Sequence, residues 1–285
     1  MKKDQKNQRY SSPAAFRMAL EDRLKNISRK ENVDIQRLRR EVAFDRFLAR
    51  LFESSKSPWV LKGGYAMELR IKEARATTDI DLGMKIKTIL KKGEVLEAIQ
   101  NEASHDLHDH FEFIIGSASM DLAGSPYGGA RYPVDARMDG RTFAKFHVDI
   151  ALGDILIEPL KKIKSRDWLS FSHIPAGVYV AIAEEQQFAE KIHAYTLPRQ
   201  KPNSRVRDLV DMHLLIRSEL MDGKKTKDMI LGTFKRRKTH PVPSILPAPV
   251  PAWKEPFQAL AKECGLNEDI EKSFSTVTAY YQKLF

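Results

Sequence analysis

The sequence predicts an α/β (α+β) fold followed by a mostly helical C-terminal part. Between residues 59 and 152, short segments alternate apolar and polar side chains as half-buried strands do, and helical segments lie among them. From Ala181 onward, apolar residues recur at helical spacing. We therefore expect a disordered, basic N-terminus at 1–12, an α/β domain at 13–180 and a helical domain at 181–285.

The first domain should begin with two helices. Ser12-Pro13 is typical of a helix start, because proline is tolerated at the first helical position. Apolar spacing predicts helices at 14–28 and 35–53, a short helix at 65–72 and another at 88–103. The alternating segments predict strands at 59–61, 78–82, 111–119, 130–137 and 145–152.

The second domain should be built from helices alone. Helical spacing predicts segments at 183–197, 205–219 and 225–235, then a proline-rich break at 241–251, and then helices at 253–263 and 267–284.

Composition limits the possible partners and compartments. Lys and Arg number 48 against 38 Asp and Glu, and the formal net charge of +10 favours a polyanionic partner. The single Cys264 excludes an internal disulfide. No apolar run approaches the roughly 20 residues that span a bilayer, and no apolar core follows Met1 to Arg9. We expect a cytoplasmic protein without a membrane partner.

Two aspartates shortly after a Gly-Gly turn are the most informative feature. If residues 78–82 are extended, Asp79 and Asp81 point to the same side and Ile80 points to the other. Two carboxylates about 4 Å apart repel by roughly 4 kcal/mol at an effective dielectric of about 20. A cation between them relieves that repulsion, and carboxylate oxygens favour Mg²⁺ or Mn²⁺.

A third acid, Asp149, could complete a metal site. Phe146, Val148 and Ile150 alternate with His147 and Asp149, which places the aspartate on the open face of a strand. Either acidic motif alone would also fit an ordinary strand end with solvated acids. Their order after the Gly-Gly turn favours a shared site, in which backbone amides at Gly63 and Gly64 could bind phosphates.

The helical part offers further candidates. Lys191 lies at the edge of an apolar stripe, where a lysine can reach to water or can stabilise negative charge on a leaving pyrophosphate. Asp208 and Asp211 are three residues apart and share a helix face. Either could orient Lys191 or meet an acceptor.

These motifs together resemble a known family. The Gly-Gly turn, the R-x-T-x-D-x-D run from Arg75 to Asp81, the h-x-h-D-h-x-x-G-D run ending at Asp154, and the later lysine with an R-x-R-D-x-x-D helix are similar to the AbiEii/AbiGii-type nucleotidyltransferase toxins of bacterial abortive-infection and toxin–antitoxin systems. The resemblance covers residues 35–220 and implies a mixed sheet flanked by helices. It also implies transfer of a nucleoside monophosphate from an NTP to an acceptor, which for several relatives is the 3′ end of tRNA, with a cognate antitoxin as partner.

The resemblance also assigns roles to residues. Asp79, Asp81 and Asp149 would bind Mg²⁺ or Mn²⁺, and Lys191 would neutralise the leaving group. Asp208 is favoured over Asp211 as the helix acid, because it follows a basic residue as in the family pattern. The triphosphate contacts would come from Gly63, Gly64, Tyr65, Arg75, Thr77 and Thr78, with Tyr65 standing where Ser or Thr is common.

Basic clusters are candidates for RNA contact. The first lies just beyond the third-acid strand, the second flanks Asp208, and the third could equally be a solvated helix end. They are Lys161, Lys162 and Lys164; Arg205 and Arg207; and Lys235, Arg236 and Arg237.

Other functions remain open from the sequence. The acceptor could be a protein or a small molecule, since the motifs do not specify it. The fold could also serve as a non-catalytic module that binds RNA or a partner, although such a role would not need three acids and a lysine. A kinase-like or antitoxin role finds no support, because the sequence has neither a P-loop nor a kinase catalytic loop.

Overall fold

The computed structural model describes residues 10–85, 92–122, 128–153, 156–199 and 205–285, which group into two units. The sheet unit comprises the described parts of 1–61, 78–153 and 162–180, and the helical unit those of 62–77, 154–161 and 181–285. A single division after residue 180 was expected. The grouping instead assigns 62–77, which includes the Gly-Gly turn, to the helical unit.

The sheet unit contains a mixed sheet, as expected. Its strands run in the order β3-β5-β6-β2-β1-β8-β7, with β4 beside β5. β2 is parallel to β6, whereas β5 is antiparallel to both β6 and β3. The strands are β1 (Trp59–Lys62), β2 (Asp79–Met84), β3 (Glu112–Ile115), β4 (Met120–Asp121), β5 (Gly129–Met138), β6 (Arg141–Ala151), β7 (Lys161–Lys164) and β8 (Val178–Ala181).

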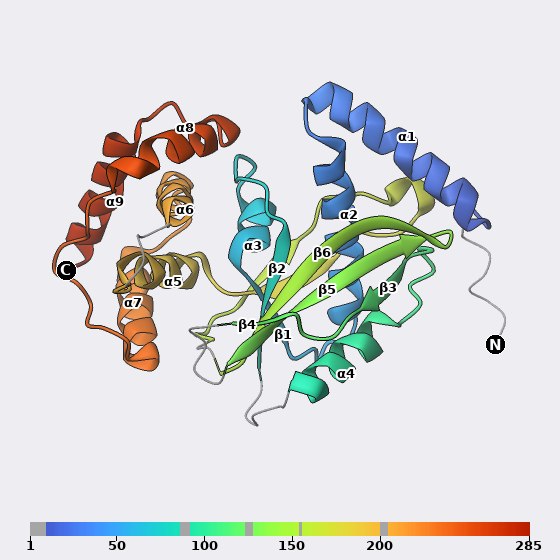
Figure 1. Cartoon of the computed structure of the whole chain (residues 1–285), viewed down its shortest axis with the longest axis horizontal. Helices are drawn as coiled ribbons and strands as arrows, with labels where there is room; N and C mark the ends of the chain where they lie inside the picture. Colours follow the sequence, from blue (N-terminus) through green and yellow to red (C-terminus); the bar gives the residue numbers. More distant parts are fainter. Residues whose placement is uncertain (1–9, 86–91, 123–127, 154–155, 200–204) are drawn as a thin grey trace. The chain divides into compact units, whose positions relative to one another are not determined.

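Helices of the sheet unit cover one face of this sheet. They are α1 (Pro13–Glu31), α2 (Ile35–Leu51) and α4 (Lys92–Ala103), with a short η2 (Ser170–Ser172). In Figure 1, α2 runs along the sheet behind β5 and β6. Phe44 and Phe47 of α2 pack edge-on against Phe146 of β6, with ring centroids 4.9 and 5.6 Å apart. Residues that alternate with Phe146 on β6 therefore face away from α2.

A tight turn joins β5 to β6 and sets the pairing between them. Asp139 and Gly140 have φ of 54° and 68°, a conformation that an Asp-Gly pair adopts readily in two-residue hairpin turns. The register slips once, between Ala136 and Arg137. Because β6 is also paired with β2, this hairpin decides which β5 side chain lies beside the acids of β2 and β6.

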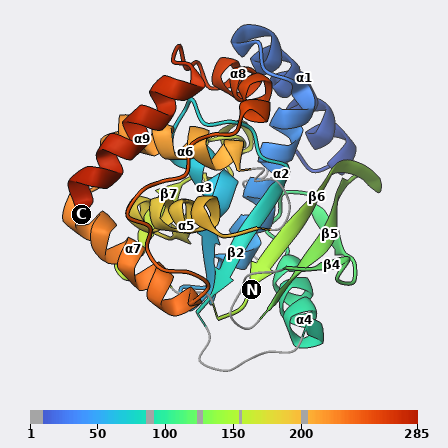
Figure 2. The ribbon, with the colours of Figure 1, turned by 60° about the vertical axis from the view of Figure 1, so that its left-hand side comes forward.

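The helical unit has its own apolar core. Phe188 and Ile192 of α5 pack with Leu209 and Val210 of α6, and all four are fully buried. In Figure 2, α5, α6, α7 and α9 lie together as one group of helices. The elements are α3 (Gly63–Arg70), α5 (Glu184–Thr196), α6 (Val206–Arg217), α7 (Gly223–Arg237), η3 (Pro251–Trp253), α8 (Lys254–Glu263) and α9 (Ile270–Leu284).

Most expected elements are confirmed within a few residues. The short helix begins at Gly63 rather than at residue 65, so it starts inside the Gly-Gly turn. The strands β4, β7 and β8 were not foreseen. Residues 1–9 of the segment expected to be disordered, the start of the helix at 88–103 and Asp154 fall outside the described residues. The last residues of that segment are ordered, since Tyr10 packs against Phe16 and Phe171 and Ser12 caps α1. Within the described part of the chain, no helix is both long and apolar enough to span a bilayer.

Candidate functional site

Three aspartates lie on the open face of the central strands. In β2, Asp79 and Asp81 are partly exposed while Ile80 and Leu82 are fully buried, which confirms the expected alternation. Asp149 of β6 is the register partner of Asp81. The three carboxylates therefore project from adjacent parallel strands on the same side of the sheet.

An arginine that the sequence did not single out joins these carboxylates. Arg131 of β5 is the register partner of Asp149, so Arg131, Asp149 and Asp81 form one row across three strands. The Arg131 Nε and Nη2 donate to the two carboxylate oxygens of Asp149, both at 2.7 Å. Its Nη2 also donates to Asp79 Oδ2 at 2.9 Å. We call Arg131, Asp149, Asp79 and Asp81 the carboxylate row.

The acids also act on the charge of the arginine. The hydrogen bonds to Asp149 raise the pKa of Arg131 further above its ordinary value, and the negative charges of Asp149, Asp79 and Asp81 add to this shift. Burial opposes the shift. Arg131 is therefore a permanent cation within the row.

The donor types of the row suit a divalent metal. Carboxylates on adjacent strands provide the hard oxygen ligands of Mg²⁺ or Mn²⁺. In the described part of the chain, no three His, Cys, Asp or Glu side chains are gathered as a metal-binding group. Asp79 and Asp149 instead turn toward the guanidinium of Arg131. Asp79, Asp81 and Asp149 could hold a metal here if the carboxylates that contact Arg131 also contacted the ion.

The Gly-Gly turn is a tightly packed strand-to-helix junction. Gly63 has a φ of 62°, a conformation that residues with a side chain rarely adopt. A Cβ added to Gly64 would lie 2.6 Å from the Oγ1 of Thr77. Lys62 occupies the N-cap of α3 and gives no side-chain cap hydrogen bond. The two glycines thus bring the start of α3 against Thr77, with the first helical amides not capped by that side chain.

The predicted lysine belongs to a buried charge cluster in the helical unit. Lys191 Nζ donates to Asp211 Oδ2 at 2.6 Å and lies 3.4 Å from Asp208 Oδ1. Arg75 approaches the same Asp211 with Nε at 3.2 Å and Nη2 at 3.1 Å. The Asp211 side chain is 1% exposed, whereas that of Asp208 is 13% exposed. Asp211 is the acid that contacts both cations, and the choice of Asp208 as the family's helix acid stays a prediction.

Mutual pairing stabilises the charged forms of this cluster. Burial would raise the pKa of Asp211, but Lys191 and Arg75 outweigh it and lower that pKa below its ordinary value. Burial likewise would lower the pKa of Lys191, and Asp211 and Asp208 raise it instead. Lys191 is therefore charged at neutral pH.

The remaining nucleotide candidates differ in accessibility. Tyr65 is 1% exposed, so its side chain has almost no surface available to a ligand. Thr77 is also buried, and its backbone N–H donates to Glu68 Oε1 at 2.6 Å. Thr78 is exposed.

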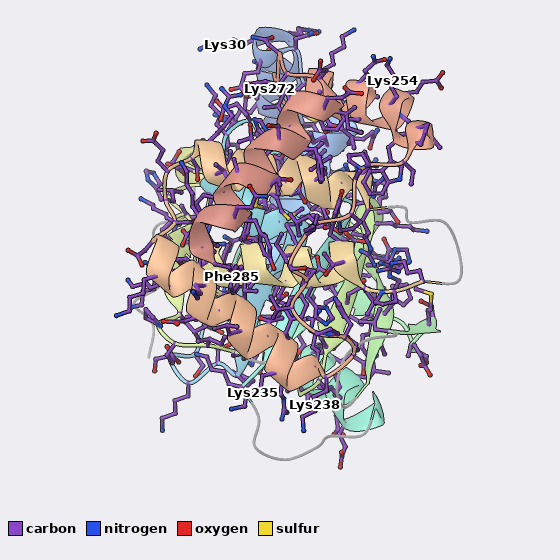
Figure 3. All side chains as sticks on the ribbon, turned by 90° about the vertical axis from the view of Figure 1, so that its left-hand side faces the viewer. Lys30, Lys235, Lys238, Lys254, Lys272 and Phe285 are labelled. Carbon is purple, nitrogen blue, oxygen red and sulfur yellow. The ribbon has the colours of Figure 1, made fainter. Side chains whose placement is uncertain are left out.

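The basic candidates for RNA contact are mostly at the surface. Lys161, Lys162 and Lys164 are exposed along β7, and Arg207 is exposed on α6. Lys235 lies at the end of α7, beside the labelled Lys238 in Figure 3, and Arg236 next to it is also exposed. Two others already face acids, since Arg205 lies 3.5 Å from Asp208 and Arg237 lies 4.0 Å from Glu190.

A groove adjoins the carboxylate row within the sheet unit. Its volume is about 620 Å³, and it is bordered by Thr78, which precedes Asp79, and by His147, the register partner of Asp79. Ile114 and Pro133 give it an apolar floor, and its basic residues are Arg40 and Lys145. The sequence did not predict this groove, because strands distant in the chain form it.

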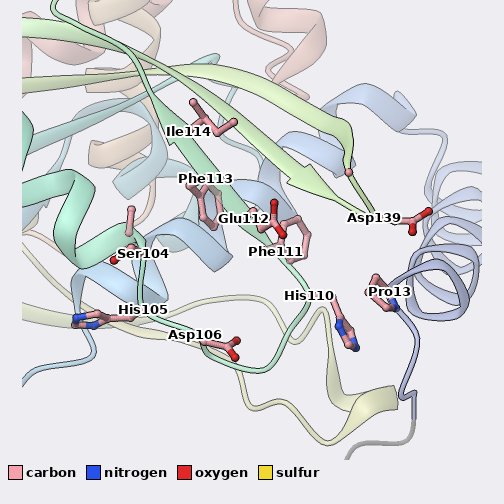
Figure 4. Close-up of a pocket in the computed structure, with 12 residues that line it drawn as sticks. Pro13, Ser104, His105, Asp106, His110, Phe111, Glu112, Phe113, Ile114 and Asp139 are labelled. Atoms are coloured by element: carbon pink, nitrogen blue, oxygen red, sulfur yellow. The ribbon is translucent and has the colours of Figure 1, made fainter.

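A second pocket of the sheet unit lies at the other end of β5. It has a volume of about 700 Å³ and includes His105, His110 and the hairpin turn at Asp139 (Figure 4). Asp139 is eight residues from Arg131 along the hairpin, a distance of roughly 26 Å at about 3.3 Å per residue. The turn end of this pocket is therefore far from the carboxylate row, while its opposite side shares Ile114 with the groove.

Comparison with known proteins identifies the family. Residues 46–280 match the model of the family described as nucleotidyl transferase AbiEii toxin, type IV toxin–antitoxin system. The chain belongs to the AbiEii toxin family. It is accordingly a nucleotidyltransferase, and the family's place in toxin–antitoxin systems implies a nucleotide substrate and an antitoxin partner. Comparison with curated proteins found no match.

A solved structure with the same fold is that of MenT4. MenT4, a nucleotidyltransferase toxin from Mycobacterium tuberculosis H37Rv, is 16% identical, with a TM-score of 0.54 over 88% of this chain and 91% of its own. A Helicobacter pylori protein of known structure is 13% identical, with a TM-score of 0.49 over 88% of this chain and 96% of its own. The AbiEii member described here thus shares the MenT4 fold at low sequence identity.

Proposed function

We propose that this nucleotidyltransferase transfers a nucleoside monophosphate from an NTP to the 3′ end of tRNA, in a reaction that requires Mg²⁺ or Mn²⁺, and thereby blocks translation. The observation that carries the proposal is the carboxylate row. Three aspartates on two parallel strands of an open sheet face are the arrangement that metal-assisted displacement at a phosphate needs.

Different residues are proposed to bind the metal and the triphosphate. Asp79, Asp81 and Asp149 would hold the metal, which when bound would neutralise phosphate charge and polarise the acceptor hydroxyl. The backbone amides at Gly63 and Gly64, where α3 begins, are proposed to bind the triphosphate. The side chain of Thr78, one residue before Asp79, is exposed and could donate a hydrogen bond to it.

Lys191 is proposed to stabilise charge on the leaving pyrophosphate. The ammonium group of Lys191 has three N–H donors. Two acids of α6, Asp208 and Asp211, lie beside this group. Asp211 fixes the position of the lysine and keeps it charged, so Asp211 serves as a positioning residue. Arg75 shares Asp211 and adds a second cation to the cluster.

The groove beside the carboxylate row supports a nucleic-acid acceptor. Ile114 is 50% exposed there, and with Pro133 it offers an apolar surface on which a terminal base could lie. Arg40 and Lys145 supply positive charge for phosphates. The net charge of +10 and the exposed lysines of β7 are consistent with a larger polyanion.

Labelled nucleotides test the proposal directly. The purified protein is incubated with total tRNA and Mg²⁺, and with each α-labelled NTP in turn, beside the Asp79→Asn variant as control. We expect label in tRNA with the wild type and none with the variant. Label on protein or on a small acceptor, with none on tRNA, would favour the alternative acceptors. Absence of transfer to any acceptor would contradict the catalytic proposal.

A further inference from the structure

Arg131 makes unequal contacts with the two acids that it bridges. Asp149 receives two parallel hydrogen bonds, both at 2.7 Å, whereas Asp79 receives one at 2.9 Å from Nη2. Asp149 is also the cross-strand partner of Arg131 and is 12% exposed, compared with 28% for Asp79. The pair with Asp149 is therefore fixed by backbone register and by two bonds, and the contact with Asp79 is the weaker one.

The contact with Asp79 brings a guanidinium to a proposed metal ligand. A divalent ion bound between Asp79 and Asp81 would be repelled by the positive charge of Arg131. Arg131 is close enough to Asp81 to feel the negative charge of that carboxylate as well. The ion and the guanidinium cannot both use the same Asp79 oxygen without cost. Binding of the metal must then weaken the Arg131–Asp79 bond.

We propose that Arg131 is a positioning residue that competes with the divalent metal for Asp79 while it holds Asp149 in place. The proposal rests on the assignment of the metal to the carboxylate row. When the metal binds, a metal–Asp79 contact replaces the single Arg131–Asp79 hydrogen bond. The two hydrogen bonds from Arg131 to Asp149 persist. Arg131 thereby lowers metal affinity in the absence of nucleotide.

The freed end of Arg131 has a use in the same site. A guanidinium binds phosphate oxygens with the planar geometry that it uses for carboxylates. When Nη2 leaves Asp79, it can donate to a phosphate of the NTP that arrives with the metal. Metal and NTP binding would therefore favour one another through Arg131.

Metal titration of the full chain without nucleotide tests the competition. Mn²⁺ binding to metal-depleted protein is measured by calorimetry and by the spin resonance of free Mn²⁺. We expect Arg131→Gln to bind Mn²⁺ about tenfold more tightly than the wild type, because a positive charge beside the ligands is removed. Arg137→Gln is the matched control, since Arg137 lies on the same strand and pairs with Asp135 at 2.7 Å. Its affinity should stay within about twofold of the wild type.

A second variant covers the case in which Arg131→Gln does not fold. Arg131→Lys keeps the charge but cannot bind Asp149 through two parallel bonds, so its Mn²⁺ affinity should rise by a smaller factor. A merely structural role would not tighten metal binding in either variant. The inference would be overturned if the Arg131 variants that fold bound Mn²⁺ no more tightly than Arg137→Gln does, or more weakly than the wild type does.

The Asp79→Asn variant separates this inference from the proposed function. Loss of Mn²⁺ binding in Asp79→Asn, with no tightening in the Arg131 variants, would reject the competition and leave the metal site standing. Unchanged Mn²⁺ binding in Asp79→Asn would reject the metal assignment itself, and the competition with it.

Discussion

Lys191 and Asp211 form a direct ion pair in the interior of the helical unit, with Nζ and Oδ2 separated by 2.6 Å. Asp211 also accepts two hydrogen bonds from Arg75, so two cations share one buried carboxylate. Removing that carboxylate leaves Lys191 and Arg75 without their shared partner. This asymmetry distinguishes Asp211 from its neighbour Asp208, which lies farther from Lys191 and nearer to solvent.

The first prediction follows from this asymmetry. Asp211→Asn should lower the free energy of unfolding by about 3 kcal/mol, because breaking a buried pair strands its partner charges. Asp208→Asn should cost less than about 1 kcal/mol, since that pair is longer and partly solvated. Urea denaturation of the two variants measures the difference. Equal losses would show that Asp211 does not hold the cluster.

The second prediction concerns acid stability. The folded-state pKa values of Asp211 and Asp109 lie below their ordinary values, because paired cations outweigh burial. Asp109 accepts hydrogen bonds from Arg46 and from both terminal nitrogens of Arg50. A carboxyl with a lowered folded pKa stabilises the protein above its unfolded pKa of about 3.9, and that contribution is lost as pH falls through the folded value.

Unfolding free energy should therefore decrease as pH is lowered below about 4. The measurement is urea denaturation between pH 7 and pH 2.5. Asp109→Asn should be less stable than the wild type at pH 7 and should show a shallower decrease in acid. A variant that keeps the full wild-type pH dependence would assign the acid sensitivity to other groups.

The third prediction separates catalysis from folding in the carboxylate row. Asp79→Asn and Asp81→Asn should each lower nucleotidyl transfer by more than about 100-fold. Replacing a residue that only hydrogen-bonds to a metal ligand costs up to about 100-fold, and loss of the ligand itself should cost more. Asp79→Asn should not stabilise the fold, because Asp79 receives a hydrogen bond from Arg131. Transfer of label is measured beside thermal unfolding. Asp139→Asn, in the hairpin turn, is the control and should retain activity.

The fourth prediction tests the packing of the Gly-Gly turn. Gly64→Ala should destabilise the protein by about 1–3 kcal/mol, because its Cβ would collide with the Cβ and Oγ1 of Thr77. Gly93→Ala is the matched control, since nothing lies within 4 Å of a Cβ added at Gly93. It should be neutral or stabilising by up to about 1 kcal/mol. Equal melting temperatures for the two variants would contradict the close approach.

Local patterns predicted the acids well, since alternation along β2 and β6 depends only on neighbouring residues. Asp79, Asp81 and Asp149 face the open side as expected. Arg131 was missed because its place depends on the register of β5 against β6, which a turn and a one-residue slip determine. An Asp-Gly pair at 139–140 was the available signal for that register.

Residues in the helical unit were harder to rank from sequence. Asp208 and Asp211 share a helix face, and only the packing of α6 against α5 decides which one meets Lys191. The grouping of 62–77 with the C-terminal helices is likewise a tertiary effect. Met67 and Ile71 pack in the core with Phe188 and Leu209, more than 100 residues away along the chain.

The last prediction tests a polyanionic acceptor against a small one. If tRNA is bound through its backbone, affinity must fall as salt rises, because each neutralised phosphate releases counterions. With about five contacts and slopes near −0.7 to −0.9 per phosphate, raising salt from about 50 to 200 mM should weaken binding by roughly 100- to 500-fold. Filter binding of labelled tRNA at several salt concentrations measures the slope.

Charge-matched variants then locate the contacts. Replacing Lys161, Lys162 and Lys164 by Ala should flatten the salt slope and leave NTP affinity nearly unchanged, because these exposed lysines lie along one strand. The control replaces Lys25, Lys30 and Lys56, which are also exposed, and should change the slope by less than about one unit. If the two triple variants changed the salt slope equally, the β7 lysines would act only through the net charge of the protein and not through specific contacts with RNA. A flat salt dependence in the wild type would reject the RNA acceptor and leave the nucleotidyltransferase chemistry intact.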